Sequence, residues 1–122
     1  MKYTISVTRF FSAAHSLRCF KGKCEKLHGH NWKVKVTLSG ARLNKTGMLL
    51  DFTDLKAVVD SVLSRLDHVY LNEVTPFDKT NPTAENIAGY IFGAVKKKIK
   101  TSAVVEKVEV WESESSSAAV SE

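Results

Sequence analysis

The sequence predicts an α+β fold in which two helices cover one side of an antiparallel sheet. Two observations lead to this prediction. Segments near the amino terminus alternate between apolar and polar residues with a period of two, which is typical of strands with one buried face. Two later segments repeat apolar residues at three- and four-residue spacing, which is typical of amphipathic helices. Because the two helices follow one another between the strands, the order favours an antiparallel sheet with its helices on one side.

The first predicted strand covers residues 3–10 and runs toward His15. The second covers residues 31–39, where the apolar positions alternate clearly: Trp32, Val34, Val36 and Leu38. A third strand is expected at residues 104–112, which are strongly β-prone, and a short final strand could occupy residues 116–120.

The first predicted helix begins near Asp51 or Thr53 and has the apolar stripe Phe52, Leu55, Val59, Val62, Leu63 and Leu66. The second follows Pro82 and Thr83, because proline suits the first turn of a helix and threonine can cap it. Its apolar stripe is Ile87, Ala88, Ile91, Phe92, Val95 and Ile99.

Length and composition fit one domain, so we expect residues 1–122 to form a single unit with one modest core. No apolar run approaches the roughly 20 residues of a membrane span, and the first residues lack the apolar stretch of a signal peptide, so a soluble cytoplasmic protein is expected.

The net charge of +5 suits nucleic acid, a phosphorylated metabolite or solubility alone, and does not identify a partner. Cys19 and Cys24 are interpreted as free thiols.

Three histidines indicate a metal site. Residues two apart on a strand point to the same face, so His28 and His30 can reach one cation. Antiparallel pairing can place His15, at the end of the preceding strand, opposite them. Three imidazole nitrogens at about 2.0–2.1 Å would hold Zn²⁺ with a fourth position open, which favours catalysis. The alternative is that one or more of these histidines only makes hydrogen bonds.

Residues 16–26 form a predicted polar loop that ends with two candidate groups, Cys24 and Glu25. Cys24 could be a fourth zinc ligand, which would make the metal structural. Alternatively, a thiolate beside the metal would have a lowered pKa and could act as a base. Glu25 is either a second proton acceptor or a solvated surface carboxylate.

Two further candidates lie elsewhere in the chain. In the pair Asp67 and His68 the carboxylate can orient the imidazole or stabilise its protonated form, although His68 could also be a helix C-cap. Glu112 ends a strand face that otherwise carries Val108 and Val110. It is therefore either an exposed strand terminus or an anchor for a ligand with paired N–H donors.

Six motifs occur in an order that resembles the 6-pyruvoyltetrahydropterin synthase and 6-carboxytetrahydropterin synthase family: FSAAH, CExxHGHNW, GMLLDF, LDHVYLN, NPTAENIA and VWES. The resemblance covers most of the chain. It implies a T-fold, in which antiparallel strands are backed by two helices and three subunits close a barrel. Two trimers would stack into a homohexamer, with pterin sites between subunits.

By this resemblance His15, His28 and His30 match the family's zinc ligands, and Cys24 matches its catalytic base. The implied cofactor is Zn²⁺. The implied substrate is 7,8-dihydroneopterin triphosphate, a small molecule whose side-chain hydroxyls would bind the open zinc position.

The other roles implied by the resemblance concern the pterin and the proton transfers. Asp67 and His68 match a proton-relay pair, and Glu112 matches the carboxylate that anchors the guanidine-like edge of the pterin. Thr83 falls in the segment that lines the pterin pocket, although it can also act only as a helix cap. Glu25 matches the glutamate of an E-x-x-H-G-H motif found in members that act in folate synthesis.

The spacing between Cys24 and His28 resembles the carboxytetrahydropterin branch, which makes 6-carboxy-5,6,7,8-tetrahydropterin for the route to queuosine and releases acetaldehyde and triphosphate. The composite CExxHGH resembles a subgroup able to make 6-hydroxymethyl-7,8-dihydropterin as well. Pyruvoyltetrahydropterin formation is a further alternative. A non-enzymatic zinc-stabilised module for RNA is a poorer account, because few aromatic residues are placed to stack bases and no RNA-binding motif is present.

Overall fold

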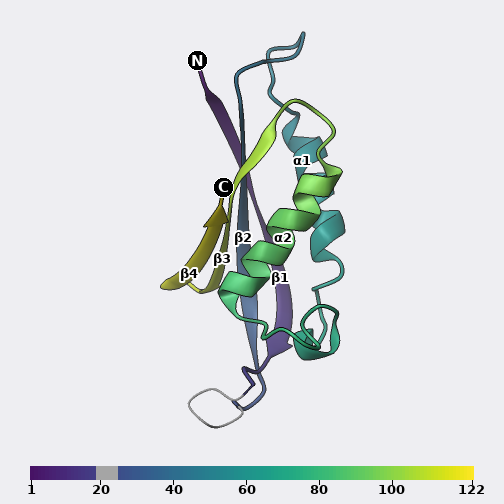
Figure 1. Ribbon diagram of the computed structural model, residues 1–122, viewed down its shortest axis with the longest axis vertical. Coiled ribbons are helices and arrows are strands. Elements are labelled where there is room, and N and C mark those ends of the chain that lie inside the picture. Colours follow the sequence, from purple (N-terminus) through teal and green to yellow (C-terminus); the bar gives the residue numbers. More distant parts are fainter. Residues whose placement is uncertain (19–24) are drawn as a thin grey trace.

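The fold was obtained as a computed structural model, which describes residues 1–18 and 25–122. Four strands form one antiparallel sheet in the order β1-β2-β3-β4. They are β1 (Tyr3–His15), β2 (His28–Gly40), β3 (Val104–Ser113) and β4 (Ser116–Ser121). The helices α1 (Phe52–Leu63) and α2 (Ala84–Lys98) lie side by side on one face of the sheet, and the short 3-10 helix η1 (Leu71–Glu73) connects them (Figure 1). The predicted α+β architecture is confirmed.

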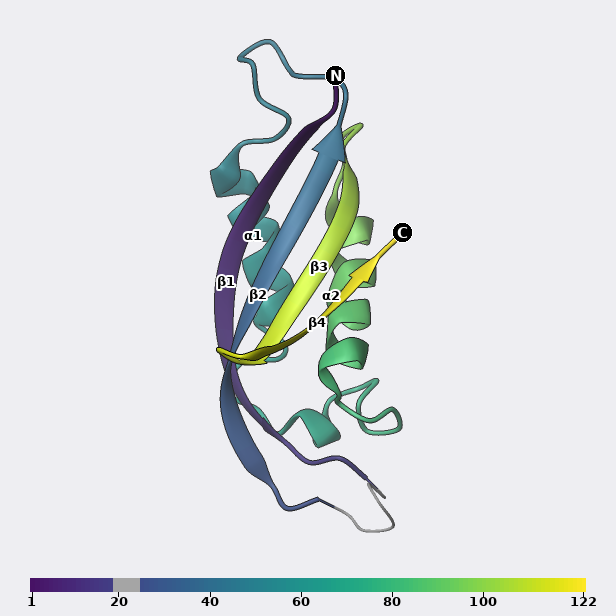
Figure 2. The same ribbon diagram turned by 90° about the vertical axis from the view of Figure 1, so that its left-hand side faces the viewer.

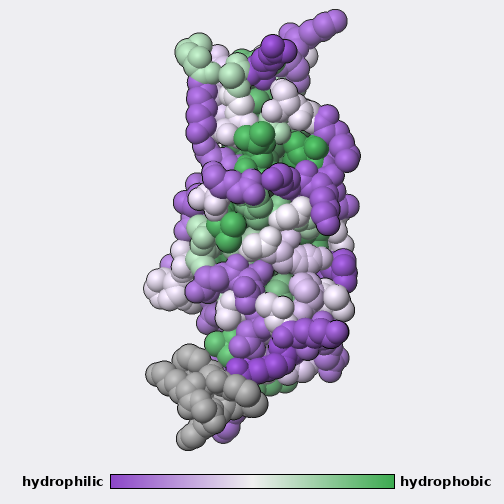
Figure 3. All heavy atoms as spheres, viewed as in Figure 1, coloured by the Kyte–Doolittle hydropathy of each residue, from purple (hydrophilic) through white to green (hydrophobic). Residues whose placement is uncertain are grey.

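The core lies between the sheet and the two helices. The alternating positions of β2 predicted to face inward, Trp32, Val34, Val36 and Leu38, are all completely buried. The helices bury the predicted stripes against them, including Leu55, Val59, Ile87 and Ile91. Polar side chains surround small apolar areas on the face seen in Figure 3, as expected when helices turn their apolar stripes toward a sheet.

Helix boundaries follow the local sequence. Asp51 caps α1 by accepting a hydrogen bond from the Thr53 N–H at 2.7 Å, and Thr83 caps α2 by accepting one from the Asn86 N–H at 3.1 Å. Lysines 96–98 occupy the last turn of α2, where positive charge complements the helix dipole. No helix in the described part of the chain is long and apolar enough to span a membrane.

The first two strands are longer than the sequence predicts, and this extension positions the candidate site. β1 and β2 pair without interruption from Tyr3 opposite Gly40 to His15 opposite His28. β3 pairs with β2 only as far as Lys33, which lies opposite Trp111. The carboxyl end of β1 and the amino end of β2 therefore extend as a pair beyond the rest of the sheet (Figure 2). The three histidines therefore lie within this two-stranded extension, close to the carboxyl end of β3.

Candidate metal centre

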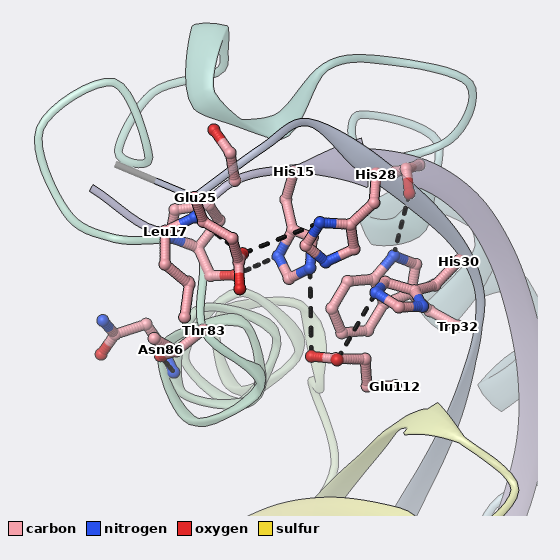
Figure 4. A network of polar contacts seen from close by, with 12 residues as sticks. His15, Leu17, Glu25, His28, His30, Trp32, Thr83, Asn86 and Glu112 are labelled. Atoms are coloured by element: carbon pink, nitrogen blue, oxygen red, sulfur yellow. Dashed lines mark hydrogen bonds and ion pairs between the residues drawn. The ribbon is translucent and has the colours of Figure 1, made fainter. Parts of the chain in front are cut away.

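The predicted strand pairing brings the three histidines together. His15 lies opposite His28, and His30 follows two residues later on the same face of β2. The ring centroids are 4.6 Å apart for His15 and His28, 5.1 Å for His15 and His30, and 4.8 Å for His28 and His30. Trp32, the next inward residue of β2, lies beneath them with its ring centroid 4.9 Å from that of His15. Figure 4 shows the three imidazoles converging from the two strands.

Backbone carbonyl groups fix the orientation of two of the rings. Nδ1 of His15 lies 2.8 Å from the carbonyl oxygen of Pro82, and Nδ1 of His28 lies 2.9 Å from that of Lys26. Because a carbonyl oxygen can only accept, each Nδ1 must carry the proton when the ring is neutral, which leaves Nε2 with a free lone pair. Metal-binding histidines in proteins are commonly oriented in this way, with one ring N–H donating to a backbone carbonyl and the other nitrogen facing the metal.

The unpartnered nitrogens indicate where a cation would fit. Within the described residues, Nε2 of His15 and Nε2 of His30 are buried without any hydrogen-bond partner. Buried polar atoms are rarely left in this state unless something else binds them. One potential ligand atom from each of the three histidines and from Glu112 can be chosen so that all lie within 4.8 Å of one another. These residues therefore fit a metal ion.

Glu112 reaches this group from the end of β3. One carboxylate oxygen lies 3.4 Å from Nε2 of His30 and the other lies 3.9 Å from Nε2 of His15. Four ligands at about 2.0–2.1 Å from a tetrahedral zinc ion are about 3.4 Å apart, so the carboxylate is close enough to approach a bound ion. Burial lowers the pKa of His30, and the nearby Glu112 carboxylate only partly opposes that effect. His30 is thus favoured in the neutral form that binds metals.

Glu25 lies beside the histidines and outside their common centre. Its backbone N–H donates to the Leu17 carbonyl at 2.9 Å, and its side chain accepts from the Leu17 N–H at 3.1 Å. The same carboxylate is 3.7 Å from Nδ1 of His28 (Figure 4). Glu25 is thus half-buried and tied to the loop, which differs from a fully solvated surface carboxylate. Cys24, like Cys19, lies outside the described residues.

Asp67 and His68 form a pair as predicted, but they lie at the edge of β1 and outside the group of four metal-binding candidates. Asp67 accepts from the Ser12 N–H at 2.9 Å and lies 2.9 Å from Nδ1 of His68. The hydrogen bond from the Ser12 N–H lowers the pKa of Asp67 below its usual range, and the neighbouring His68 acts in the same direction. Asp67 is therefore a carboxylate at neutral pH. The His68 side chain is 81% exposed.

The backbone of His68 shows why it is not a helix cap. Helix α1 ends at Leu63, well before His68, so the alternative interpretation as a C-cap is wrong. His68 has a φ of 57° in the left-handed region, and its N–H donates to the Ser12 carbonyl at 2.6 Å. With His30 it lines an open depression of 470 Å³. A substrate or a neighbouring chain can therefore reach this imidazole.

The remaining predicted residue, Thr83, uses its hydroxyl to cap α2. This contact supports its capping role and gives no direct evidence of a role in ligand binding. Sequence reasoning missed the carbonyl groups of Pro82 and Lys26, which orient the histidines. A pattern of side chains does not predict which backbone carbonyl will accept a hydrogen bond, so these contacts can be identified only in the tertiary structure.

The similarity of the chain to known proteins identifies its family. The family described as 6-pyruvoyl tetrahydropterin synthase matches residues 4–122. The chain belongs to this family. A relative from Archaeoglobus fulgidus, named putative 6-carboxy-5,6,7,8-tetrahydropterin synthase, is 41% identical over 110 residues, which cover 88% of this chain and 90% of the relative.

Two other family members extend the comparison. The dihydroneopterin monophosphate aldolase of Pyrococcus furiosus is 36% identical over 112 residues, covering 92% of this chain and 91% of the relative. The solved structure of 6-pyruvoyl tetrahydropterin synthase from Caenorhabditis elegans has a TM-score of 0.86 and 29% sequence identity, and covers 100% of this chain and 96% of that one. For the single chain, the antiparallel sheet backed by two helices that the T-fold resemblance implies is confirmed, and the chain is an enzyme of this pterin-processing family. The alternative of a non-enzymatic RNA-binding module is therefore wrong.

Proposed function

We propose that the enzyme converts 7,8-dihydroneopterin triphosphate, with uptake of water, into 6-carboxy-5,6,7,8-tetrahydropterin, acetaldehyde and triphosphate. The observation that carries this proposal is the convergence of three histidines, two of which have a buried Nε2 atom without a hydrogen-bond partner among the described residues. The name of the A. fulgidus relative supports the choice of product. The reaction would serve the route to queuosine, as the motif resemblance implies, and it would take place in the cytoplasm, as expected from a sequence without a long apolar run.

His15, His28 and His30 would hold a zinc ion through their Nε2 atoms. When bound, the ion supplies Lewis-acid polarisation of the substrate's side-chain hydroxyl groups and lowers the cost of losing a proton from them or from the neighbouring carbon. The protein contributes the fixed tautomers of His15 and His28, since their Nδ1 protons are held by carbonyl groups. The fully buried ring of Trp32 covers the side of the site that faces the core and excludes water from that side.

Cys24 would act as the proton acceptor, as the motif resemblance implies. His68 would supply or relay a proton. Its imidazole is suited to this role because the Asp67 carboxylate, 2.9 Å from Nδ1, orients the exposed ring. The high exposure of His68 is consistent with a site that is completed when subunits assemble. We therefore include a homohexamer built from two trimers in the proposal.

Glu112 would bind the pterin through paired hydrogen bonds to its guanidine-like edge. A carboxylate accepts two parallel N–H donors from such a group, which fixes the orientation of the planar ring. Glu112 is suited to reach a ligand because it lies where β3 ends, next to a cavity of 790 Å³ that His30 and Trp111 also line. Thr83 would lie near this ligand while its hydroxyl continues to cap α2.

Formation of 6-hydroxymethyl-7,8-dihydropterin for folate synthesis is a second candidate function, because Glu25 is held 3.7 Å from His28. The aldolase name of the P. furiosus relative also favours it. In this reaction Glu25 would accept the proton in place of Cys24. Pyruvoyltetrahydropterin formation is a third possible outcome, suggested by the C. elegans structure.

Product analysis distinguishes these functions. The zinc-loaded enzyme is incubated with 7,8-dihydroneopterin triphosphate under anaerobic conditions, and the pterins are identified by liquid chromatography with mass spectrometry. Acetaldehyde is trapped as a hydrazone. Carboxytetrahydropterin and acetaldehyde in equal amounts are expected. Hydroxymethyldihydropterin or pyruvoyltetrahydropterin as the sole product would replace the first proposal by the corresponding alternative, and no turnover would contradict all three.

A further inference from the structure

The residues immediately after His15 are held by two asparagine side chains from the segment before α2. Asn72 accepts from the Ser16 N–H at 2.9 Å and donates to the Ser16 carbonyl at 2.7 Å. Asn81 accepts from the Arg18 N–H at 2.8 Å and donates to the Arg18 carbonyl at 3.2 Å. Each amide thus satisfies both backbone groups of one residue, as a neighbouring strand would.

Arg18 makes the reverse contact with its side chain. Its guanidinium donates to the backbone carbonyl oxygen of Asn72 in η1 at 3.0 Å, and to those of Phe77 at 2.6 Å and Thr80 at 3.5 Å in the segment between η1 and α2. A guanidinium has several N–H donors in a planar fork and stays charged at any physiological pH, so one side chain can hold several carbonyls in fixed positions. This segment is therefore fastened to the end of β1.

The segment that Arg18 holds contains the carbonyl group that orients His15. Pro82 follows Asn81 directly, and its carbonyl oxygen accepts from Nδ1 of His15 at 2.8 Å in the buried interior. Within the described chain, all hydrogen bonds between residues 16–18 and residues 77–81 involve Arg18. The guanidinium makes those to Phe77 and Thr80, and the Arg18 backbone makes those to the side chain of Asn81. Contacts within the segment itself, such as Thr83 N–H to the Asn81 carbonyl at 2.9 Å, do not reach the strand that carries His15.

We propose that Arg18 is a positioning residue for the metal centre: it holds the segment before α2 so that the Pro82 carbonyl keeps the proton of His15 on Nδ1 and leaves Nε2 free for the metal. This inference rests on the proposed metal site. If the carbonyl moves away, the neutral ring can carry its proton on Nε2, where it blocks metal binding. Loss of an outer partner of a metal-binding histidine weakens metal affinity by about 10–100-fold.

The test compares Arg18→Met with Arg65→Met. The first removes the three donors and keeps an apolar stem. The second is a matched control, because Arg65 also donates to a backbone carbonyl, that of Thr75 at 3.5 Å, but does so on the exposed surface. Circular dichroism and thermal unfolding verify that each variant is folded. Metal-free protein labelled with ¹⁵N-histidine is then examined by solid-state NMR at pH 8, where neutral imidazole tautomers are distinguished by their nitrogen shifts.

The expected result is that His15 loses its uniform Nδ1–H tautomer in Arg18→Met, while His28 keeps its own because the Lys26 carbonyl is on a separate segment. Zinc affinity, measured by competition with a chromophoric chelator, should weaken by about 10–100-fold. Activity should return toward the wild-type value at saturating zinc. Arg65→Met should change none of these quantities.

An unchanged His15 tautomer together with unchanged zinc affinity in folded Arg18→Met would overturn the inference. If that variant does not fold, Asn81→Ala, which removes the other side-chain link, decides the question by the same two measurements. The tautomer measurement uses metal-free protein, so it remains decisive if the wild-type protein fails to bind zinc. That failure would contradict the proposed function alone.

Discussion

Replacing Glu112 by glutamine tests whether this carboxylate binds the pterin or the metal. Its oxygens lie 3.4 Å from Nε2 of His30 and 3.9 Å from Nε2 of His15, so its position permits either role. Glutamine preserves the shape of the side chain. It removes the negative charge and turns one of the two acceptor atoms into an N–H donor, which would face a donor of the pterin.

If Glu112 anchors the pterin, Glu112→Gln should keep its zinc and lose catalytic efficiency. A hydrogen bond to a charged group contributes about 1.5–3 kcal/mol, so loss of one such bond lowers kcat/KM by about 10–150-fold. Most of the loss should appear as a higher KM, because the anchor contacts a part of the ring that binds equally in the ground state and the transition state.

The assay combines zinc content, by inductively coupled plasma mass spectrometry after gel filtration, with steady-state kinetics on 7,8-dihydroneopterin triphosphate. Glu109→Gln is the control, because Glu109 is on the same strand but its carboxylate accepts from the Ser117 hydroxyl at 2.8 Å. Loss of zinc from Glu112→Gln alone would refute the anchor role and make Glu112 a metal ligand. An unchanged kcat/KM with full zinc content would refute both roles.

Three further predictions concern the metal, the proton acceptors and the pH dependence. Replacing His28 by alanine should greatly reduce zinc occupancy and lower the melting temperature, because metal binding is coupled to folding; full zinc content would exclude His28 as a ligand. Cys24→Ala and Glu25→Ala should retain zinc but impair different products, carboxytetrahydropterin and hydroxymethyldihydropterin respectively, by about 10²–10⁴-fold in rate. Equal loss of both products in Cys24→Ala with no effect in Glu25→Ala would leave Cys24 as the single base. In metal-free protein the pKa of His30 is lowered by burial, so its contribution to stability is fully present above pH 6.5 and is lost as the pH falls from 6.5 through the lowered value. Urea unfolding between pH 7.5 and 5 should therefore show a steeper loss of stability on acidification for the wild type than for His30→Gln, and parallel curves would contradict this.

The part of the fold set by periodicity could be predicted from the sequence. The alternation through Trp32 and Val36 defines the inner face of β2, and the same period of two places His28 and His30 on that face. The strand extensions were harder to predict, because small residues such as Ser12 and Gly29 do not favour strands by themselves. The Ser12 hydroxyl instead donates to the side chain of Asn31 on the neighbouring strand at 2.7 Å.

Other parts of the site depend on contacts that no local pattern encodes. The approach of Glu112 to the histidines depends on where β3 stops pairing with β2, and that point is fixed by the whole sheet. The carbonyl of Pro82 reaches His15 across 67 positions of sequence. Its role is carried by the backbone, and the residue type therefore gives no signal of it.

The separation of Asp67 and His68 from the metal-binding candidates also has a structural cause. The segment after α1 runs along the free edge of β1, where Tyr70 forms a bridge with Ala14. β4 forms the opposite edge of the sheet. Edge strands such as β4 are commonly covered by other chains, which agrees with the proposed assembly. Light scattering should find a hexamer, and a fully active monomer at micromolar concentration would contradict the shared site.

The central claim is that three histidines hold a zinc ion whose remaining position is open to substrate. X-ray absorption at the zinc edge of the purified, zinc-loaded enzyme tests it most directly, because nitrogen and sulfur ligands scatter at different distances. The account predicts one zinc per chain with three imidazole nitrogens at about 2.0–2.1 Å and no sulfur ligand. A sulfur scatterer at about 2.3 Å would show that a cysteine closes the site, and would contradict an open catalytic metal centre.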